Sequence, residues 1–165
     1  MATLQDMNIS RDYMIWLAET EFGGGSYNGP SLIETLRSLS AEEAVSTDTY
    51  EGYSAWGVAL HVLFLKYKIG QELGADMPEY THDENGWPSL PEDTGEESYQ
   101  AMIAELEAFH KAVMDAFRNA SPEQLEAPMP GWKISLGRAF AWLISHDTNH
   151  NTQIRNMGLP SLREA

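Results

Sequence analysis

The segment WLISHDTNHNTQI, residues 142–154, carries the most informative helical pattern in this 165-residue chain. A helix of about 3.6 residues per turn places residues three or four apart on one face. The face that crosses this segment is Ala139, Leu143, His146, His150, Ile154 and Met157. Two histidines therefore stand in the middle of an apolar stripe with the spacing of a bundle core, and we expect both rings to face the interior.

Helical periodicity continues through the rest of the chain, and no convincing strand alternation interrupts it. We expect a first helical region from about Ser10, broken by FGGGSYNGP at 22–30 and resumed from Pro30 as PSLIETLRSL. Longer helices are predicted over 54–73, 96–120 and 135–157, with short capped turns beginning at Ser40 and Ser121. Four long helices around one core predict an all-α fold, a four-helix bundle, in a single domain over residues 1–165.

The segment 76–99 separates two of these helices and has a different composition. It holds three prolines, eight carboxylates and no lysine or arginine, which is typical of a solvated connection. Its length favours a crossover bundle over a simple up-and-down bundle. We interpret His82, inside this segment, as a solvated loop residue.

Charge and composition exclude several functions. Ten Lys and Arg against 25 Asp and Glu give a net charge of −15, so we expect neither a nucleic-acid partner nor an anionic membrane surface as partner. With no cysteine, there is no thiolate ligand or cysteine nucleophile. The N-terminus lacks the pattern of a secretory signal, and the apolar run 55–65 is too short to cross a bilayer. These features favour a cytoplasmic protein.

A third histidine has the same setting as the pair. On the helix predicted over 54–73, His61 shares a side with Val58, Phe64, Leu65 and Lys68. Buried imidazoles need hydrogen-bonding partners, and a divalent metal would satisfy one nitrogen of each of three rings. The alternative is that each is an ordinary, hydrogen-bonded core histidine. His110 lies on another core-spaced stripe, and we place it at the edge of that stripe rather than among the ligands.

Three segments together resemble a known family. SAWGVALHVLFLKY at 54–67 and WLISHDTNHNTQI are similar to the two signature segments of the DinB-like (YfiT-like) superfamily, and YNGPSLIETLRSLSAEEA at 27–44 resembles the entry to the first bundle helix in one of its subgroups. The resemblance implies a four-helix bundle with a crossover, a metal site formed by His61, His146 and His150, bound zinc or nickel, and a homodimer. The chain departs from the family pattern at Thr152, where a glycine is usual before Gln153.

Three neutral imidazoles with an open coordination position are typical of catalytic rather than structural zinc. The resemblance implies a small-molecule substrate. Among the reactions it suggests, we favour a thiol-dependent S-transferase, in which bacillithiol, mycothiol or glutathione is activated as a metal-bound thiolate. A hydrolase that uses a metal-bound hydroxide remains an alternative, as does a non-catalytic, metal-stabilised binding or stress-response module.

Two further residues of the last helix are candidates for roles beside the metal. Asp147 is the candidate catalytic residue, as a general base or as an acceptor for a ligand ring, and the alternative is a solvated or helix-pairing carboxylate. Gln153 is expected to orient a ring or a substrate. Four of the tryptophans are expected to pack in the core or between helices: Trp16, Trp56, Trp132 and Trp142. Of these, Trp56 and Trp142 are also candidates to line a pocket beside the metal.

Overall fold

The computed structural model describes residues 4–163, with side chains from residue 11 onward. Within that range the chain forms eight helices and no strand: α1 (Leu4–Gly23), α2 (Leu32–Arg37), α3 (Ala41–Val45), α4 (Ala55–Leu73), α5 (Glu96–Asn119), α6 (Pro122–Glu126), α7 (Leu136–Arg155) and α8 (Pro160–Arg163). The predicted all-α fold is confirmed. One domain over 1–165 stays a prediction, because both ends of that range lie outside the described residues.

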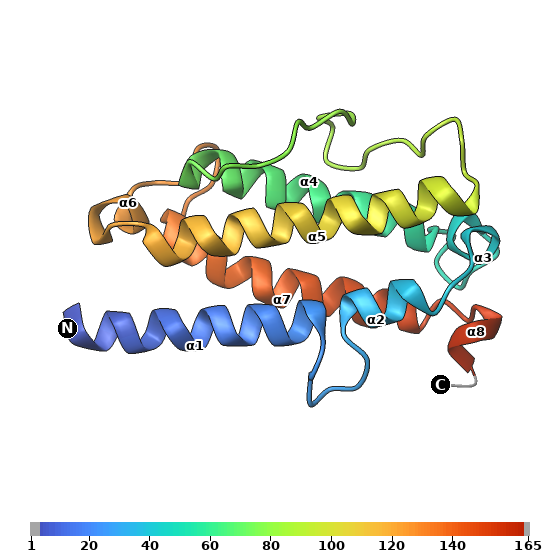
Figure 1. Ribbon diagram of the computed structural model, residues 1–165, viewed down its shortest axis with the longest axis horizontal. Helices are drawn as coiled ribbons and strands as arrows, with labels where there is room; N and C mark the ends of the chain where they lie inside the picture. The colour runs from blue at the N-terminus through green and yellow to red at the C-terminus, as the bar shows by residue number, and fades with distance from the viewer. Residues whose placement is uncertain (1–3, 164–165) are drawn as a thin grey trace.

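Four long helices, α1, α4, α5 and α7, form the bundle (Figure 1). Both α4 and α1 pack against α5 and α7, so α1 and α4 lie diagonally opposite each other. Figure 1 shows that α4 and α5 run in the same direction, because the connection between them returns along the length of the bundle, while α1 and α7 run the opposite way. The predicted crossover topology is therefore confirmed.

The ends of α4 follow from its sequence. The Ser54 hydroxyl accepts a hydrogen bond from the Gly57 amide and caps the first turn. Gly74 ends the helix at φ 67°, in the left-handed region that glycine adopts without a steric penalty. The predicted range of 54–73 is confirmed. Because both ends of the helix are fixed in this way, the position of His61 along the bundle is fixed as well.

The first helical region differs in detail from the prediction. Helix α1 begins at Leu4, earlier than the expected start near Ser10. Helix α2 has Ser31 as its N-cap, in a reciprocal capping box with Glu34. Pro30 therefore precedes the helix instead of occupying its first turn, because the Ser31 side chain supplies the better cap.

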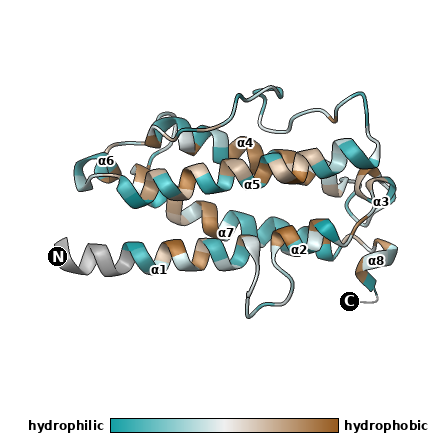
Figure 2. Ribbon diagram, viewed as in Figure 1, coloured by the Kyte–Doolittle hydropathy of each residue, from teal (hydrophilic) through white to brown (hydrophobic). Residues whose placement is uncertain are grey.

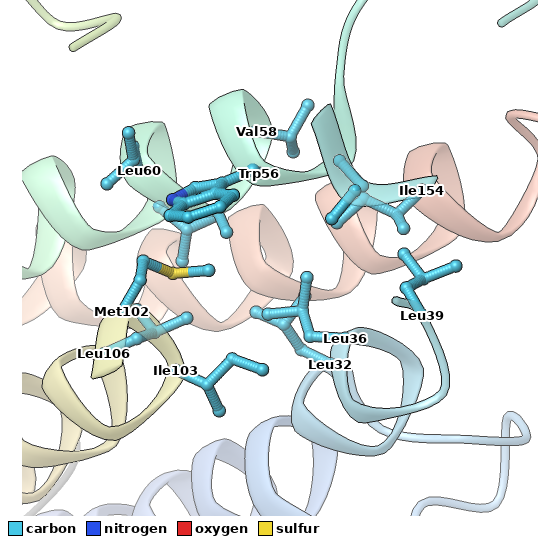
Figure 3. Close-up of a cluster of buried hydrophobic side chains, with 14 of the residues drawn as sticks. Leu32, Leu36, Leu39, Trp56, Val58, Leu60, Met102, Ile103, Leu106 and Ile154 are labelled. Carbon is cyan, nitrogen blue, oxygen red and sulfur yellow. The ribbon is translucent and has the colours of Figure 1, made fainter. Parts of the chain in front are cut away.

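The apolar core has two clusters: one lies where α2, α4, α5 and α7 meet (Figure 3), and the other lies between α1, α4, α5 and α7. Trp56 is almost fully buried at the centre of the first cluster, beside Met102 and Leu60. Figure 2 shows the first half of α7 as mainly hydrophobic and its second half, which carries the histidines, as mainly hydrophilic. Packing of Trp56 is confirmed, and Trp132 is partly buried against the core. Trp16 and Trp142 are 52% and 39% exposed, so the predicted packing in the core or between helices was wrong for these two.

The connection 74–95 is mostly exposed, as the sequence predicted, but several of its side chains pack on the bundle. Tyr80 stacks on Tyr67 of α4 with ring centroids 4.0 Å apart. His82 Nε2 lies 2.9 Å from a carboxylate oxygen of Glu105 on α5, which raises the pKa of the histidine through that hydrogen bond. The interpretation of His82 as a solvated residue was wrong, because a chain that crosses back over two helices passes their side chains at close range.

None of the helices within residues 4–163 combines the length and the apolar character that a bilayer-spanning helix needs.

Candidate metal centre

Three histidines from two helices meet inside the bundle. His146 and His150 leave the same face of α7, one turn apart, and His61 projects toward them from α4. One ring nitrogen from each of the three lies within 4.8 Å of the others. His61 Nε2 and His146 Nε2 are 3.0 Å apart. The structure thus brings together the three histidines that the sequence analysis grouped, and their role as ligands stays a prediction.

The outward nitrogens of two of the rings are held by oxygen atoms. His61 Nδ1 bonds to the carbonyl oxygen of Gly86, and His150 Nδ1 lies 2.7 Å from Gln153 Oε1. Both oxygens only accept hydrogen bonds, so each Nδ1 carries the proton and each Nε2 presents a lone pair. Gln153 is itself fixed by donating to Glu51 over 2.6 Å. This agrees with the expectation that Gln153 orients a ring.

Two of the rings, those of His61 and His146, have lowered pKa values that favour the neutral form. Burial lowers the pKa of His61, although the hydrogen bond to Gly86 opposes that shift. Burial also lowers the pKa of His146 to about 3, and the neighbouring His150 and His61 add to the effect. Since a metal binds the unprotonated imidazole nitrogen, no proton has to be removed from these two rings at neutral pH.

The geometry fits one divalent ion. Zinc–imidazole bonds of about 2.0–2.1 Å bring ligand nitrogens to within about 4 Å of one another, so small side-chain rotations would complete the set. His146 Nδ1 has no hydrogen-bonding partner among the described residues, so its tautomer is not fixed, and the 3.0 Å between His61 Nε2 and His146 Nε2 fits either a hydrogen bond donated by His146 or a shared cation. Nδ1–H groups that donate to oxygens are also the usual environment of metal-ligating histidines.

A tryptophan that the sequence analysis did not single out covers the site. In the connection 74–95, the Asn85 side chain accepts a hydrogen bond from the Trp87 amide, and Gly86 adopts φ 86°. This turn directs the Gly86 carbonyl toward His61 and lays the Trp87 ring on the imidazole, with centroids 4.0 Å apart and planes 7° from parallel. Trp142 contacts the cluster from another side, 4.6 Å from the His146 ring centroid.

A cavity of about 410 Å³ opens beside His150, at the surface of the bundle. It is lined by Glu51, Tyr53, Trp87, Asn149, His150, Thr152, Gln153 and Asn156. A larger cavity, of about 780 Å³, lies across Thr152 and Asn156, between the glycine-rich loop and α2, and contains none of the three histidines. Of these two cavities, the smaller one gives a small molecule access to a candidate ligand, His150. Trp56 lies in the apolar core and lines neither cavity, so its predicted place in a pocket was wrong.

Asp147 lies next to a candidate ligand in sequence but is held elsewhere. Its carboxylate forms an ion pair with Lys66 of α4, and both side chains are almost fully buried. Burial lowers the pKa of Lys66 and raises that of Asp147, while the attraction between the two charges opposes both shifts. The alternative of a solvated carboxylate is wrong, because Asp147 is 3% exposed. Its catalytic role stays a prediction.

His110 is separate from the histidine cluster. Its ring stacks on Phe22 of α1, with centroids 3.7 Å apart, and the residue is 6% exposed. Neither ring nitrogen has a hydrogen-bonding partner in the described structure. The expected position at the edge of the core was wrong, because α1 covers this face of α5.

Replacing His110 with phenylalanine is expected to stabilise the protein. The ring stack on Phe22 is kept, and removing two buried, unpaired nitrogens gains about 1 kcal/mol at pH 7. Burial and the nearby charge of Lys66 hold the pKa of His110 in the folded protein well below its usual value. As the pH falls below the pKa of this histidine in the unfolded chain, the unfolded chain therefore takes up a proton that the folded protein does not. The advantage of His110→Phe should therefore grow by about 1.4 kcal/mol per pH unit as pH falls below about 6.5. Urea unfolding of both proteins between pH 5 and 8 measures this, and a constant difference would contradict it.

The fold and the site together define a class of protein. It is a four-helix bundle with a crossover and with a candidate three-histidine metal site between α4 and α7. The sequence profile of the DinB superfamily matches residues 32–154, which span α2 to α7 and include all three histidines. The chain belongs to the DinB superfamily, and the resemblance inferred from its sequence is confirmed. No curated protein and no solved structure matches the chain.

Proposed function

We propose that this protein is a metal-dependent, thiol-dependent S-transferase that joins a low-molecular-weight thiol to a small electrophile. The observation that carries the proposal is the set of three converging histidines, one of which borders an open cavity. When bound to three uncharged ligands, zinc or nickel keeps its full positive charge and lowers the pKa of a coordinated thiol, which favours the nucleophilic thiolate.

Residues around the three histidines would orient the ligand rings, limit the approach of water and accept a proton. Gly86 and Gln153 fix the rings of His61 and His150, so that their Nε2 atoms point to one place. Trp87 covers one face of His61 and limits the approach of water from the side of the connection. Glu51 lines the cavity and holds Gln153, which places a carboxylate where it could accept the proton that the thiol releases.

Two alternatives are less well supported. Asp147, the candidate base for hydrolysis, is engaged by Lys66, so Glu51 would have to accept the proton of the water instead. A purely structural metal would be served by a closed site, usually with four protein ligands, whereas His150 borders a cavity.

The test is thiol-dependent consumption of 1-chloro-2,4-dinitrobenzene by the zinc- or nickel-loaded protein, with bacillithiol, mycothiol or glutathione as the thiol. Turnover should be lost in His150→Ala and kept in Tyr27→Leu, which changes an exposed loop residue that lines neither cavity. Cleavage of esters without any thiol would favour the hydrolase instead. Metal binding with neither activity would contradict both enzymes.

We also propose that the protein forms a homodimer through α1. Tyr13, Trp16 and Leu17 share one face of this helix at the spacing i, i+3, i+4 and are 67%, 52% and 40% exposed. Covering such an apolar face is favourable, and a second copy would cover it symmetrically. Sedimentation of the wild type and of Trp16→Glu tests this, since only the variant should be monomeric. A cytoplasmic location and the absence of a nucleic-acid partner stay predictions from the sequence.

A further inference from the structure

The cavity beside the candidate metal site has an aromatic wall. Tyr53 and Trp87 stack with centroids 5.2 Å apart, and Trp87 continues the stack onto His61 at 4.0 Å. Trp87 also meets His150 edge-on, at 6.1 Å. The rings of two candidate ligands and the wall of the cavity therefore form one continuous aromatic surface.

Much of this surface is open to solvent. Tyr53 is 47% exposed and Trp87 is 43% exposed. Exposed aromatic area beside a cavity is typical of a binding site, because a ligand that covers it removes apolar surface from water. Flat rings add a preference for another flat ring, stacked or edge-on.

The charge of the residues that line the cavity limits the charge that a bound aromatic ligand can have. Glu51 is the one charged side chain among the lining residues, and no lysine or arginine lies among them. An anionic ring would find no counter-charge and would face the Glu51 carboxylate. A cationic ring would lie close to the divalent ion that the three histidines would hold. The lining thus favours a ligand without net charge.

We propose that this cavity binds an uncharged, planar aromatic group, and that this group is the part of the electrophile recognised by Tyr53 and Trp87. The volume of about 410 Å³ lies within the usual range of small-molecule sites, at about 300–1,000 Å³, and exceeds what a single ring needs. The proposal rests on the proposed function for the identity of the ligand as the electrophile, but the binding itself needs neither thiol nor turnover.

The test measures binding to the metal-loaded protein by ligand-observed NMR titration, with no thiol present. Three probes separate the effect of the aromatic ring from the effect of charge. They are nitrobenzene, nitrocyclohexane, which is of similar size but has no aromatic ring, and 4-nitrobenzenesulfonate, which carries a negative charge. Nitrobenzene should bind about three- to tenfold more tightly than nitrocyclohexane, which is the usual gain from an aromatic pair. It should also bind more tightly than the sulfonate.

Two variants locate the binding. Trp87→Leu and Tyr53→Leu should each reduce the preference for nitrobenzene over nitrocyclohexane, while Tyr27→Leu, at a loop residue outside the cavity, should retain it. The metal content of every variant is measured first, and the variants are compared at equal loading. Equal affinity for the two uncharged probes, or a preference unchanged in Trp87→Leu, would overturn the proposal.

This outcome is distinguishable from a failure of the proposed function. A protein that binds nitrobenzene in preference to nitrocyclohexane but transfers no thiol supports the aromatic site and rejects the transferase. A protein that transfers thiols only to aliphatic electrophiles, with no preference between the two probes, supports the transferase and rejects the aromatic site.

Discussion

Alanine at His61, His146 or His150 is expected to weaken zinc or nickel binding by about a hundredfold or more. Four-ligand structural zinc sites bind with about 10–16 kcal/mol, so each ligand contributes about 2.5–4 kcal/mol, and each 1.4 kcal/mol corresponds to a factor of ten. Elemental mass spectrometry on untagged protein and competition with a chelator measure the stoichiometry and the affinity. The wild type should hold about one ion per chain, because its three ligand nitrogens converge on a single place.

The control is His82→Ala, which removes a histidine that is paired with Glu105 on the connection and lies outside the cluster. This variant should keep its metal. Removing the metal from the wild type should also lower its free energy of unfolding. The expected loss is about 4 kcal/mol relative to protein kept with free metal at a thousand times the dissociation constant. A wild type that takes up no metal after incubation with zinc and nickel would contradict the assignment, and so would equal losses in His82→Ala and His150→Ala.

The fold and the three histidines could be predicted because their signals are local. Residues three or four apart lie on one helix face whatever the rest of the chain does, so the apolar stripe through His146 and His150 and the setting of His61 could be read directly. Gly74 and Ser54 mark helix ends through their own conformational and hydrogen-bonding preferences. The long segment without helical pattern then left a crossover as the natural connection.

Trp87 and Lys66 were missed for different reasons. Trp87 belongs to a connection without periodicity, and its contact with His61 depends on how the chain returns over the bundle, which no short pattern encodes. Lys66 did carry a signal, since Val62, Lys66, Ile69 and Leu73 have core spacing and all are buried. A lysine at a core position is rare without a partner, and that partner, Asp147, lies 81 residues away.

Replacing Lys66 with methionine is expected to destabilise the protein by about 3–5 kcal/mol, because it leaves the Asp147 carboxylate buried without a counter-charge. For a chain of this size the melting temperature should fall by roughly 6–20 °C. Asp147→Leu should have an effect of similar size, since it leaves the ammonium group of Lys66 unpaired in the same place. Thermal and urea unfolding of the metal-free proteins measure both effects without a contribution from metal binding.

The double variant Lys66→Met/Asp147→Leu decides what the ion pair contributes. Desolvating both charges costs about as much as their attraction returns, so an apolar pair of similar volume should restore the stability to within about 1–2 kcal/mol of the wild type or exceed it. Lys111→Met, which breaks an exposed ion pair with Asp115, should cost less than about 1 kcal/mol and serves as the control. Stability that stays low in the double variant would mean that Lys66 and Asp147 stabilise the bundle through their shape and packing, since neither charge would then remain to be compensated.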